Sequence, residues 1–200
     1  MFVNESALKK QIKKAYKAGQ LTVARNGEML YIASCSWAIS IDKEAVPNKT
    51  KAALIELIGE LPVNGEAFTY SAEGAQSVMP ETLRELDLDT YYDTAGQTYE
   101  ATRVFVQNSA TAVGIYIQGD DLSHYIASKE VFDMYSPESV DMSLGEEMPE
   151  KAKMNGPFLV WGNNVMAMEI LAIPSPRWSG EKAFLRSVDG IDLNWMFTEE

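Results

Sequence analysis

The chain has 200 residues, of which 46% are hydrophobic, and it carries a formal net charge of −12 at pH 7. This length and composition are typical of one sizeable globular domain or two small ones, and they exclude disorder of the whole chain. The acidic balance argues against indiscriminate nucleic-acid binding over the whole surface.

The number of cysteines and the lengths of the apolar runs narrow the class of protein further. Cys35 is the only cysteine, so the sequence predicts no intramolecular disulfide and no cysteine-rich metal site. No apolar run approaches the length of a membrane span, and the first residues lack the charge order of a secretory signal. We therefore expect a cytoplasmic protein without a membrane partner.

The first predicted element is an amphipathic helix over residues 5–19, capped by Asn4 or Ser6 and ended by Gly19. At 100° per residue, five lysines fall in one arc of about 140°. These lysines are Lys9, Lys10, Lys13, Lys14 and Lys17. The opposite, apolar side holds Leu8, Ile12, Ala15 and Tyr16. Residues 1–17 contain five lysines and one acid, so the rest of the chain carries a net charge of about −16.

Hairpin and helix signals follow in the first half. Alternating apolar residues over 21–34 flank Asn26-Gly27, a strong hairpin signal. Apolar residues at helical spacing over 46–62 predict a second helix. The other elements expected here are a third strand at 37–41, a cap on the second helix at Asn48, and a short strand at 66–71.

The second half predicts more hairpins, separated by acidic stretches. The expected elements are a helical turn at 79–87, an acidic connector at 87–100, a hairpin at 102–118 that turns around Asn108-Ser109, a strand at 124–127, a short helix at 128–135 capped by Ser128, a solvated loop or linker at 137–157, a hairpin at 156–174 that turns around Asn163-Asn164, and a strand at 183–188.

Two stretches echo each other. Residues 31–46 and 116–132 both open with Tyr-Ile and both reach Lys-Glu followed by apolar residues. The order of expected elements around them is also the same, which is consistent with an internal duplication and equally with chance. We predict an α+β fold of antiparallel β-hairpins with flanking helices, built from two related halves if the duplication is real. The units would be 1–78 and 79–200, or the two would form one domain.

The sequence contains no recognisable set of catalytic residues. The single histidine, His124, lies beside Asp120, Asp121 and Ser123, but a triad gathers residues from separate elements. Cys35 is expected to be buried as a small hydrophobe. A calcium loop over 89–100 fails because Tyr91 and Thr94 occupy positions that need a carboxylate and a glycine. Zinc ligand sets and phosphate loops are absent, so we predict no catalytic residue, metal or cofactor.

Each of two surface features has a purely structural interpretation and a functional one. The lysine face either keeps the first helix solvated or contacts phosphates of DNA. Near the C-terminus, the apolar run forms either a final buried strand or a tail that docks on a protein partner. This run contains Trp195, Met196 and Phe197.

The lysine face and the echo around Tyr31 and Tyr116 together resemble the plan of DNA sliding clamps, which are processivity factors. The resemblance implies rings of duplicated α+β units with lysine-bearing helices lining the hole and an acidic exterior. We therefore expect a non-catalytic macromolecular-interaction protein, clamp-like or scaffold-like, associated with DNA and homo-oligomeric. One alternative is an acidic binding or inhibitor protein that mimics nucleic acid, and another is an enzyme using acids that the sequence does not single out. The carboxylates of the first alternative would be Asp87, Asp89, Asp93, Glu146 and Glu147.

Overall fold

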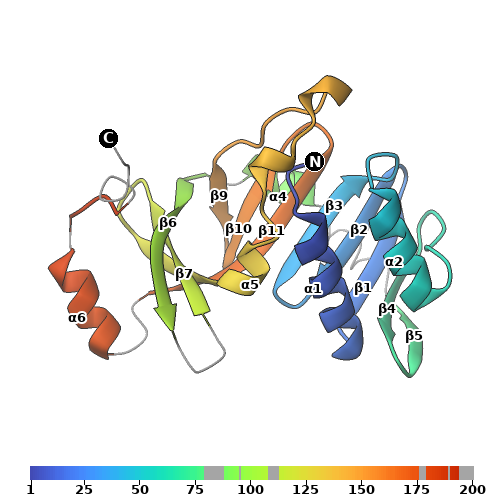
Figure 1. Ribbon diagram of the computed structural model, residues 1–200, viewed down its shortest axis with the longest axis horizontal. Coiled ribbons are helices and arrows are strands. Elements are labelled where there is room, and N and C mark those ends of the chain that lie inside the picture. The colour runs from blue at the N-terminus through green and yellow to red at the C-terminus, as the bar shows by residue number, and fades with distance from the viewer. Residues whose placement is uncertain (79–87, 95, 108–112, 176–178, 189, 194–200) are drawn as a thin grey trace.

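The computed structural model describes residues 1–78, 88–94, 96–107, 113–175, 179–188 and 190–193. Within these residues, eleven antiparallel strands form a single sheet in the order β10-β9-β6-β7-β8-β11-β3-β2-β1-β4-β5. Helices pack on both faces of this sheet, so the predicted α+β class is confirmed. Figure 1 shows the sheet running from β5 at one end of the molecule to β6 and β7 near the other.

The first helix, α1 (Glu5–Lys17), forms as the sequence predicts. Asn4 Oδ1 accepts hydrogen bonds from the backbone N–H groups of Ser6 and Ala7, each at 3.1 Å, which satisfies two of the free donors at the helix start. The helix ends before Gly19, whose φ of +68° is the left-handed conformation common after a helix. Its buried residues are Leu8, Gln11, Ile12 and Ala15.

The predicted hairpin, third strand and second helix all follow. The hairpin turns at Gly27-Glu28, one residue later than predicted, because Asn26 still pairs with Met29. The second helix begins at Asn48 itself, with Pro47 at the cap position and no side-chain cap, so the predicted cap is wrong. The elements are β1 (Leu21–Asn26), β2 (Met29–Ser34), β3 (Trp37–Asp42), α2 (Asn48–Ile58), β4 (Ala67–Ser71) and β5 (Gly74–Ser77).

The second unit differs from its prediction in two segments. The expected acidic connector contains a helix, α4 (Leu88–Thr94), because Leu88 and Tyr92 recur at helical spacing and pack toward the sheet while the acids stay outside. The expected linker at 137–157 contains two short 3₁₀ turns and a strand. The remaining elements are β6 (Thr98–Gln107), β7 (Val113–Gly119), β8 (His124–Ser128), α5 (Lys129–Phe132), η1 (Pro137–Ser139), η2 (Met142–Leu144), β9 (Ala152–Asn155) and β10 (Phe158–Gly162). Ser128 occupies the N-cap position of α5, as predicted, but its side chain makes no capping hydrogen bond. The helical turn predicted at 79–87 and the hairpin turn predicted at 108–109 lie outside the described residues.

The C-terminal part contains β11 (Met166–Pro174) and α6 (Ser179–Ser187). The prediction of a strand at 183–188 is wrong. Glu181, Phe184 and Val188 recur at helical spacing, and Glu181 and Val188 are buried on that side of α6. The hairpin around Asn163-Asn164 is confirmed, since β10 and β11 pair directly.

The two units share one strand order. Pairing runs β5-β4-β1-β2-β3 in the first unit and β10-β9-β6-β7-β8 in the second, and β11 joins β3 to β8. In both units the tyrosine of the echo pairs with the following strand, Tyr31 with Ser40 and Tyr116 with Ile126, although the second connection is one residue longer. This agreement supports the duplication hypothesis. One difference is that β10 also pairs with β11, which closes the second unit into a ring of six strands.

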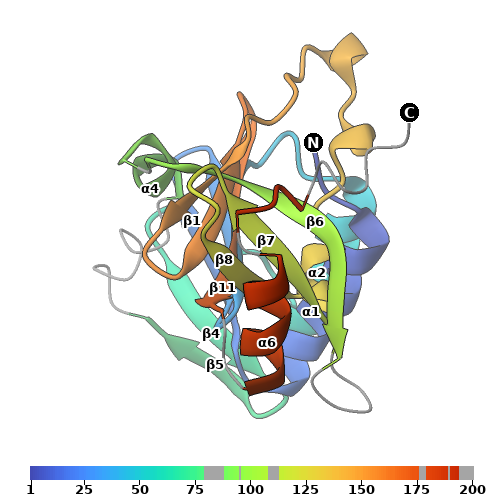
Figure 2. The ribbon, with the colours of Figure 1, turned by 90° about the vertical axis from the view of Figure 1, so that its left-hand side faces the viewer.

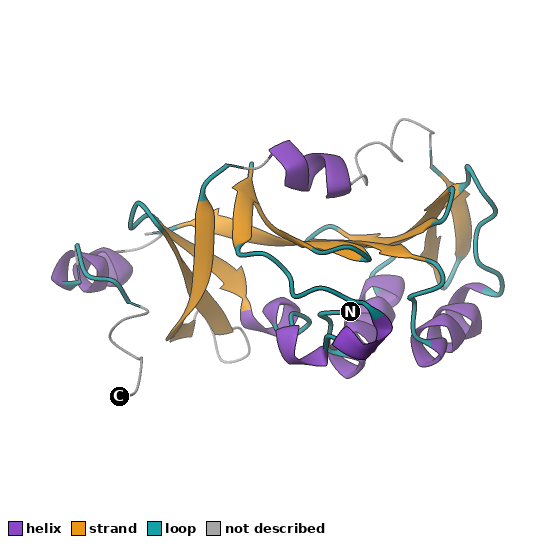
Figure 3. Ribbon diagram, turned by 90° about the horizontal axis from the view of Figure 1, so that it is seen from above, coloured by secondary structure: helices purple, strands orange, loops and turns teal. Residues whose placement is uncertain are grey.

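One hydrophobic core serves both units. It runs from Leu8 and Ile12 of α1, across the inner face of the sheet, into the ring of the second unit. There Trp161 stacks on Tyr135 with ring centroids 4.8 Å apart and meets Phe132 edge-on at 5.8 Å. Seen from above, α1, α2 and α5 lie on one side of the sheet and α4 lies on the other (Figure 3). The boundary near residue 78 therefore separates two units that share a core.

The face under α4 is lined with small residues and contains a buried carboxyl group. Ala38 and Ala167 pack with Leu88 of α4, and Glu169 lies on the same face of β11 as Ala167. Glu169 is only 9% exposed. Its burial raises its carboxyl pKa to about 7, because a charged carboxylate is poorly solvated there.

This buried carboxyl predicts that stability falls as pH rises. The folded protein holds the Glu169 proton up to about pH 7, whereas the unfolded chain releases it near pH 4.5. The contribution of protonated Glu169 to the free energy of unfolding is therefore complete below pH 4.5 and is lost as the pH rises toward 7. Glu169→Gln should raise the free energy of unfolding at pH 8 by up to about 3 kcal/mol and have little effect at pH 4. Urea unfolding at both pH values checks this, with the exposed Glu56→Gln as the control. Equal effects of the two variants at pH 8 would contradict the prediction.

Candidate nucleic-acid interface

The predicted lysine face exists on α1. Lys10, Lys13, Lys14 and Lys17 are exposed and Lys9 is half-buried. They point away from the sheet because Leu8, Ile12 and Ala15 occupy the inner side of the same helix. The local sequence pattern thus places five cations along one surface helix.

Two of these lysines meet an acid from the second unit. The Glu130 carboxylate of α5 forms ion pairs with Lys10 Nζ at 3.1 Å and with Lys14 Nζ at 2.6 Å. Hydrogen bonds from Lys14 and then Lys10 hold the pKa of the Glu130 carboxyl below its usual range. Among the described residues, Lys9, Lys13 and Lys17 form no ion pair. The positive charge of the face is therefore partly neutralised along its α5 side and free elsewhere.

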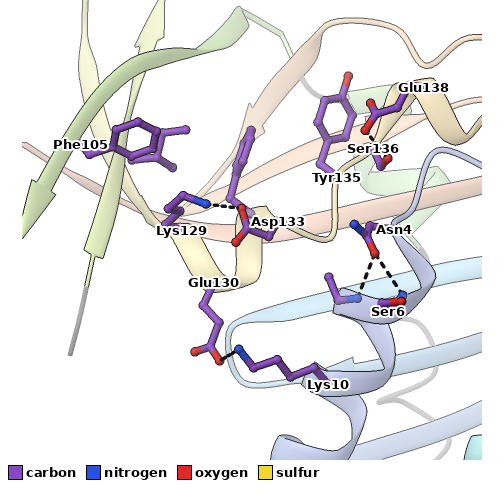
Figure 4. Close-up of a pocket in the computed structure, with 13 residues that line it drawn as sticks. Asn4, Ser6, Lys10, Phe105, Lys129, Glu130, Asp133, Tyr135, Ser136 and Glu138 are labelled. Atoms are coloured by element: carbon purple, nitrogen blue, oxygen red, sulfur yellow. Dashed lines mark hydrogen bonds and ion pairs between the residues drawn. The ribbon is translucent and has the colours of Figure 1, made fainter.

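A groove of about 610 Å³ opens where the start of α1 meets α5 and the β6–β7 hairpin (Figure 4). Its apolar walls include Phe105, which is 52% exposed, and Tyr135. Lys129 forms an ion pair with Asp133 at 2.6 Å and lies 5.9 Å from the centre of the Phe105 ring. The polar residues that line the groove are Asn4, Ser6, Lys10, Lys129, Glu130, Asp133, Ser136 and Glu138.

The charged residues that line the groove are largely paired with one another. Its lysines and carboxylates alternate and pair with one another, so no single charge dominates. Among its hydroxyl groups, that of Ser136 is engaged, because Ser136 Oγ donates to Glu138 at 2.7 Å. Histidine and cysteine are absent from its lining. Among the residues that the structure describes, no group of three or more His, Cys, Asp or Glu side chains could hold a metal ion.

The single cysteine and histidine lie elsewhere, each with its own contact. Cys35 is exposed in the turn between β2 and β3, and its Sγ lies 3.2 Å from Oε1 of Gln20, so the prediction of a buried cysteine is wrong. His124 is half-buried at the start of β8, where Nε2 lies 3.3 Å from Nε2 of Gln118. Neither residue takes part in the groove.

Acidic residues gather around a second hollow, of about 370 Å³, between α4 and the β10–β11 turn. Three of the predicted carboxylates, Asp89, Asp93 and Glu147, line it together with Asp42 and Glu150. The sequence did not single out these last two because their proximity arises only from the pairing of distant strands. Glu146 instead forms an ion pair with the amino group of Met1.

The remaining predicted site residues cannot be placed. Asp87, and the tail residues Trp195, Met196 and Phe197, lie outside the described residues.

Comparisons with models of known protein families, with curated proteins and with solved structures found no match to this chain. In the part of the chain that the structure describes, no helix is long and apolar enough to cross a membrane.

The contact between α1 and α5 yields a stability prediction. Gln11 is 3% exposed, and its Nε2 donates a hydrogen bond to the backbone oxygen of Glu130 at 3.0 Å. Gln11→Met keeps the volume but removes the donor, so we expect a loss of about 1–2 kcal/mol of unfolding free energy. Chemical denaturation measures this against Lys13→Met, which changes an exposed residue of the same helix. The prediction is wrong if the two variants lose the same amount.

Proposed function

We propose that the protein is a non-catalytic, DNA-associated interaction protein that contacts backbone phosphates through the lysine face of α1. The observation that carries the proposal is the row of outward-facing lysines in a chain of net charge −12. Three of them, Lys9, Lys13 and Lys17, have no acidic partner among the described residues. Phosphates need positive charge and no base-specific contact, which is what a face of flexible lysines offers.

The distribution of charge supports a contact limited to the helix side. The neighbouring helix α2, which packs beside α1 (Figures 1 and 3), begins with two further lysines, Lys49 and Lys51. The segment from residue 130 to residue 150 contains seven acids and no base. That segment begins in α5, on the same side of the sheet as α1, so its like charge would keep phosphates to the part of α1 that lies away from α5.

A clamp-like assembly is the second part of the proposal. The shared strand order of the two units, and the position of α1, α2 and α5 on one side of the sheet, support it. Encirclement of DNA requires several copies, and two strand edges are open to pairing with a neighbour. Beyond Tyr99, β6 pairs only with β7, and β5 pairs only with β4 among the described residues. These edges lie toward opposite ends of the sheet (Figure 1), which suits head-to-tail contacts.

A second candidate function rests on the acidic hollow. An acidic protein that binds a basic partner would use Asp89, Asp93 and Glu147, which the fold brings to one surface with Asp42 and Glu150. Nucleic-acid mimicry needs such a surface and makes no use of the lysines. The two functions are therefore separable by charge substitutions on opposite sides of the sheet.

The lysine face predicts salt-dependent DNA binding. Substituting Lys9, Lys13 and Lys17 together by Gln should weaken duplex binding at least 10-fold at low salt and reduce the slope of log K against log [salt] by about 2–3. Glu130→Gln should strengthen binding several-fold, because it frees Lys10 and Lys14. Fluorescence anisotropy measures both, with a variant in which three ion-paired lysines away from α1, Lys43, Lys151 and Lys153, are substituted by Gln as the control. Absence of binding by the unmodified chain, or unchanged binding by the first variant, would exclude this interface.

The proposed clamp-like assembly predicts that the mass of the protein in solution depends on its concentration. Sedimentation equilibrium should show a closed oligomer whose stability falls when Ser77 in β5 is replaced by Pro, since the N–H of this residue faces the open edge and proline cannot donate to a strand partner. The same substitution in Glu73, in the neighbouring turn, serves as the comparison. A strict monomer at high concentration would rule out encirclement and leave a monomeric binding protein.

A further inference from the structure

The helix α6 is attached to the second unit at two points. At its start, Ser175 donates a hydrogen bond to the buried carboxylate of Glu181, and the ring of Phe184 lies 5.7 Å from that of Tyr116 on β7. After its end, the side chain of Gln118 donates to the oxygen of Ile191 at 2.9 Å and accepts from the N–H of Leu193 at 2.8 Å. Figures 1 and 2 show α6 standing outside β7 and β8.

Between these attachments lies a groove of about 580 Å³. Glu181, Phe184 and Val188 face the sheet, so Lys182, Leu185 and Arg186 fall on an adjoining arc of about 100°. These three line the groove. Lys182 and Arg186 are exposed and form no ion pair with any described residue. Two unneutralised cations converging on one hollow are unusual in so acidic a chain.

The opposite wall is the turn between β7 and β8. Leu122 has a φ of +64°, a conformation that a bulky residue rarely adopts and that costs of order 1 kcal/mol. It is held there by a hydrogen bond from its N–H to the oxygen of Gly119 at 2.8 Å. The two acids of the turn are engaged by their own partners, since Asp121 accepts from the N–H of Ser123 and Asp120 from the hydroxyl of Thr98.

The remaining lining combines an apolar surface with one histidine. Leu122, Pro174 and Leu185 supply apolar side chains, and Tyr125 supplies an aromatic one. The two backbone contacts of Gln118 orient its amide so that Nε2 faces His124. The two side chains approach with Gln118 Nε2 and His124 Nε2 3.3 Å apart.

We propose that this groove binds a phosphate monoester that carries an apolar group. Arg186 offers a planar fork suited to phosphate oxygens and Lys182 a compact positive charge, while the leucines and Pro174 accept the apolar part. A hollow of a few hundred Å³ with a few convergent polar groups is typical of small-molecule sites. The proposal does not depend on DNA binding, because α1 contributes no residue to this groove.

The single histidine provides the test. His124 is the only histidine of the chain, so its imidazole NMR signals report on the groove without overlap. Titration of the ¹⁵N-labelled protein with phenyl phosphate at constant ionic strength should shift these signals with a saturable, millimolar or tighter curve. Inorganic phosphate should bind at least 3-fold more weakly, because it lacks the apolar group, and benzyl alcohol should not saturate.

Variants assign the binding to the named residues. Lys182→Gln combined with Arg186→Gln should weaken phenyl phosphate at least 10-fold, whereas Arg103→Gln with Lys151→Gln, an exposed pair elsewhere, should leave it unchanged. Leu122→Gly should weaken phenyl phosphate about 3-fold or more without affecting inorganic phosphate. No saturable shift up to 20 mM, or equal binding by the first double variant and the unmodified chain, would overturn the proposal.

Discussion

Strand β11 is the constraint on which the rest of the fold depends. It pairs with β3 of the first unit along Met166 to Ile170, and with β8 of the second unit along Ala172 to Pro174. It also pairs with β10, which closes the ring of the second unit. Met168 and Ile170 are fully buried in the shared core. Without this strand, the two units would have no continuous sheet between them.

The position of α1 against α5 decides the charge of the candidate interface. Glu130 reaches two of the five lysines only because the second unit places α5 beside the helix of the first. Exposed ion pairs of this kind contribute little to stability. In the proposed interface their larger effect would be on binding, since a phosphate that approaches Lys10 or Lys14 would compete with a carboxylate already in place. The three lysines outside this contact are available without such competition.

Signals contained in short stretches were readable from the sequence. The Asn4 cap and the lysine face of α1 each depend on neighbours within a few residues, and the structure contains both, while the predicted β1–β2 hairpin forms with its turn one residue later, at Gly27-Glu28. The helices α4 and α6 were missed because their apolar positions are few and their helical state depends on packing against strands far away in the sequence. The acidic hollow and the groove beside α6 were missed for a related reason. Asp42 and Glu150 become neighbours through the pairing of distant strands, and Leu122 and Lys182 through the packing of α6 on the second unit.

The place of β11 in the chain has a consequence for synthesis on the ribosome. The strand begins at Met166, while its partner β3 ends at Asp42, so more than a hundred residues must be made before that pair can form. During this interval the edge of β3, with the apolar residues Trp37, Ile39 and Ile41, has no strand to cover it. Unpaired apolar edges favour association with other chains. The first unit therefore depends on slow-forming, long-range pairing, and a nascent chain is most exposed to misassembly before β11 emerges.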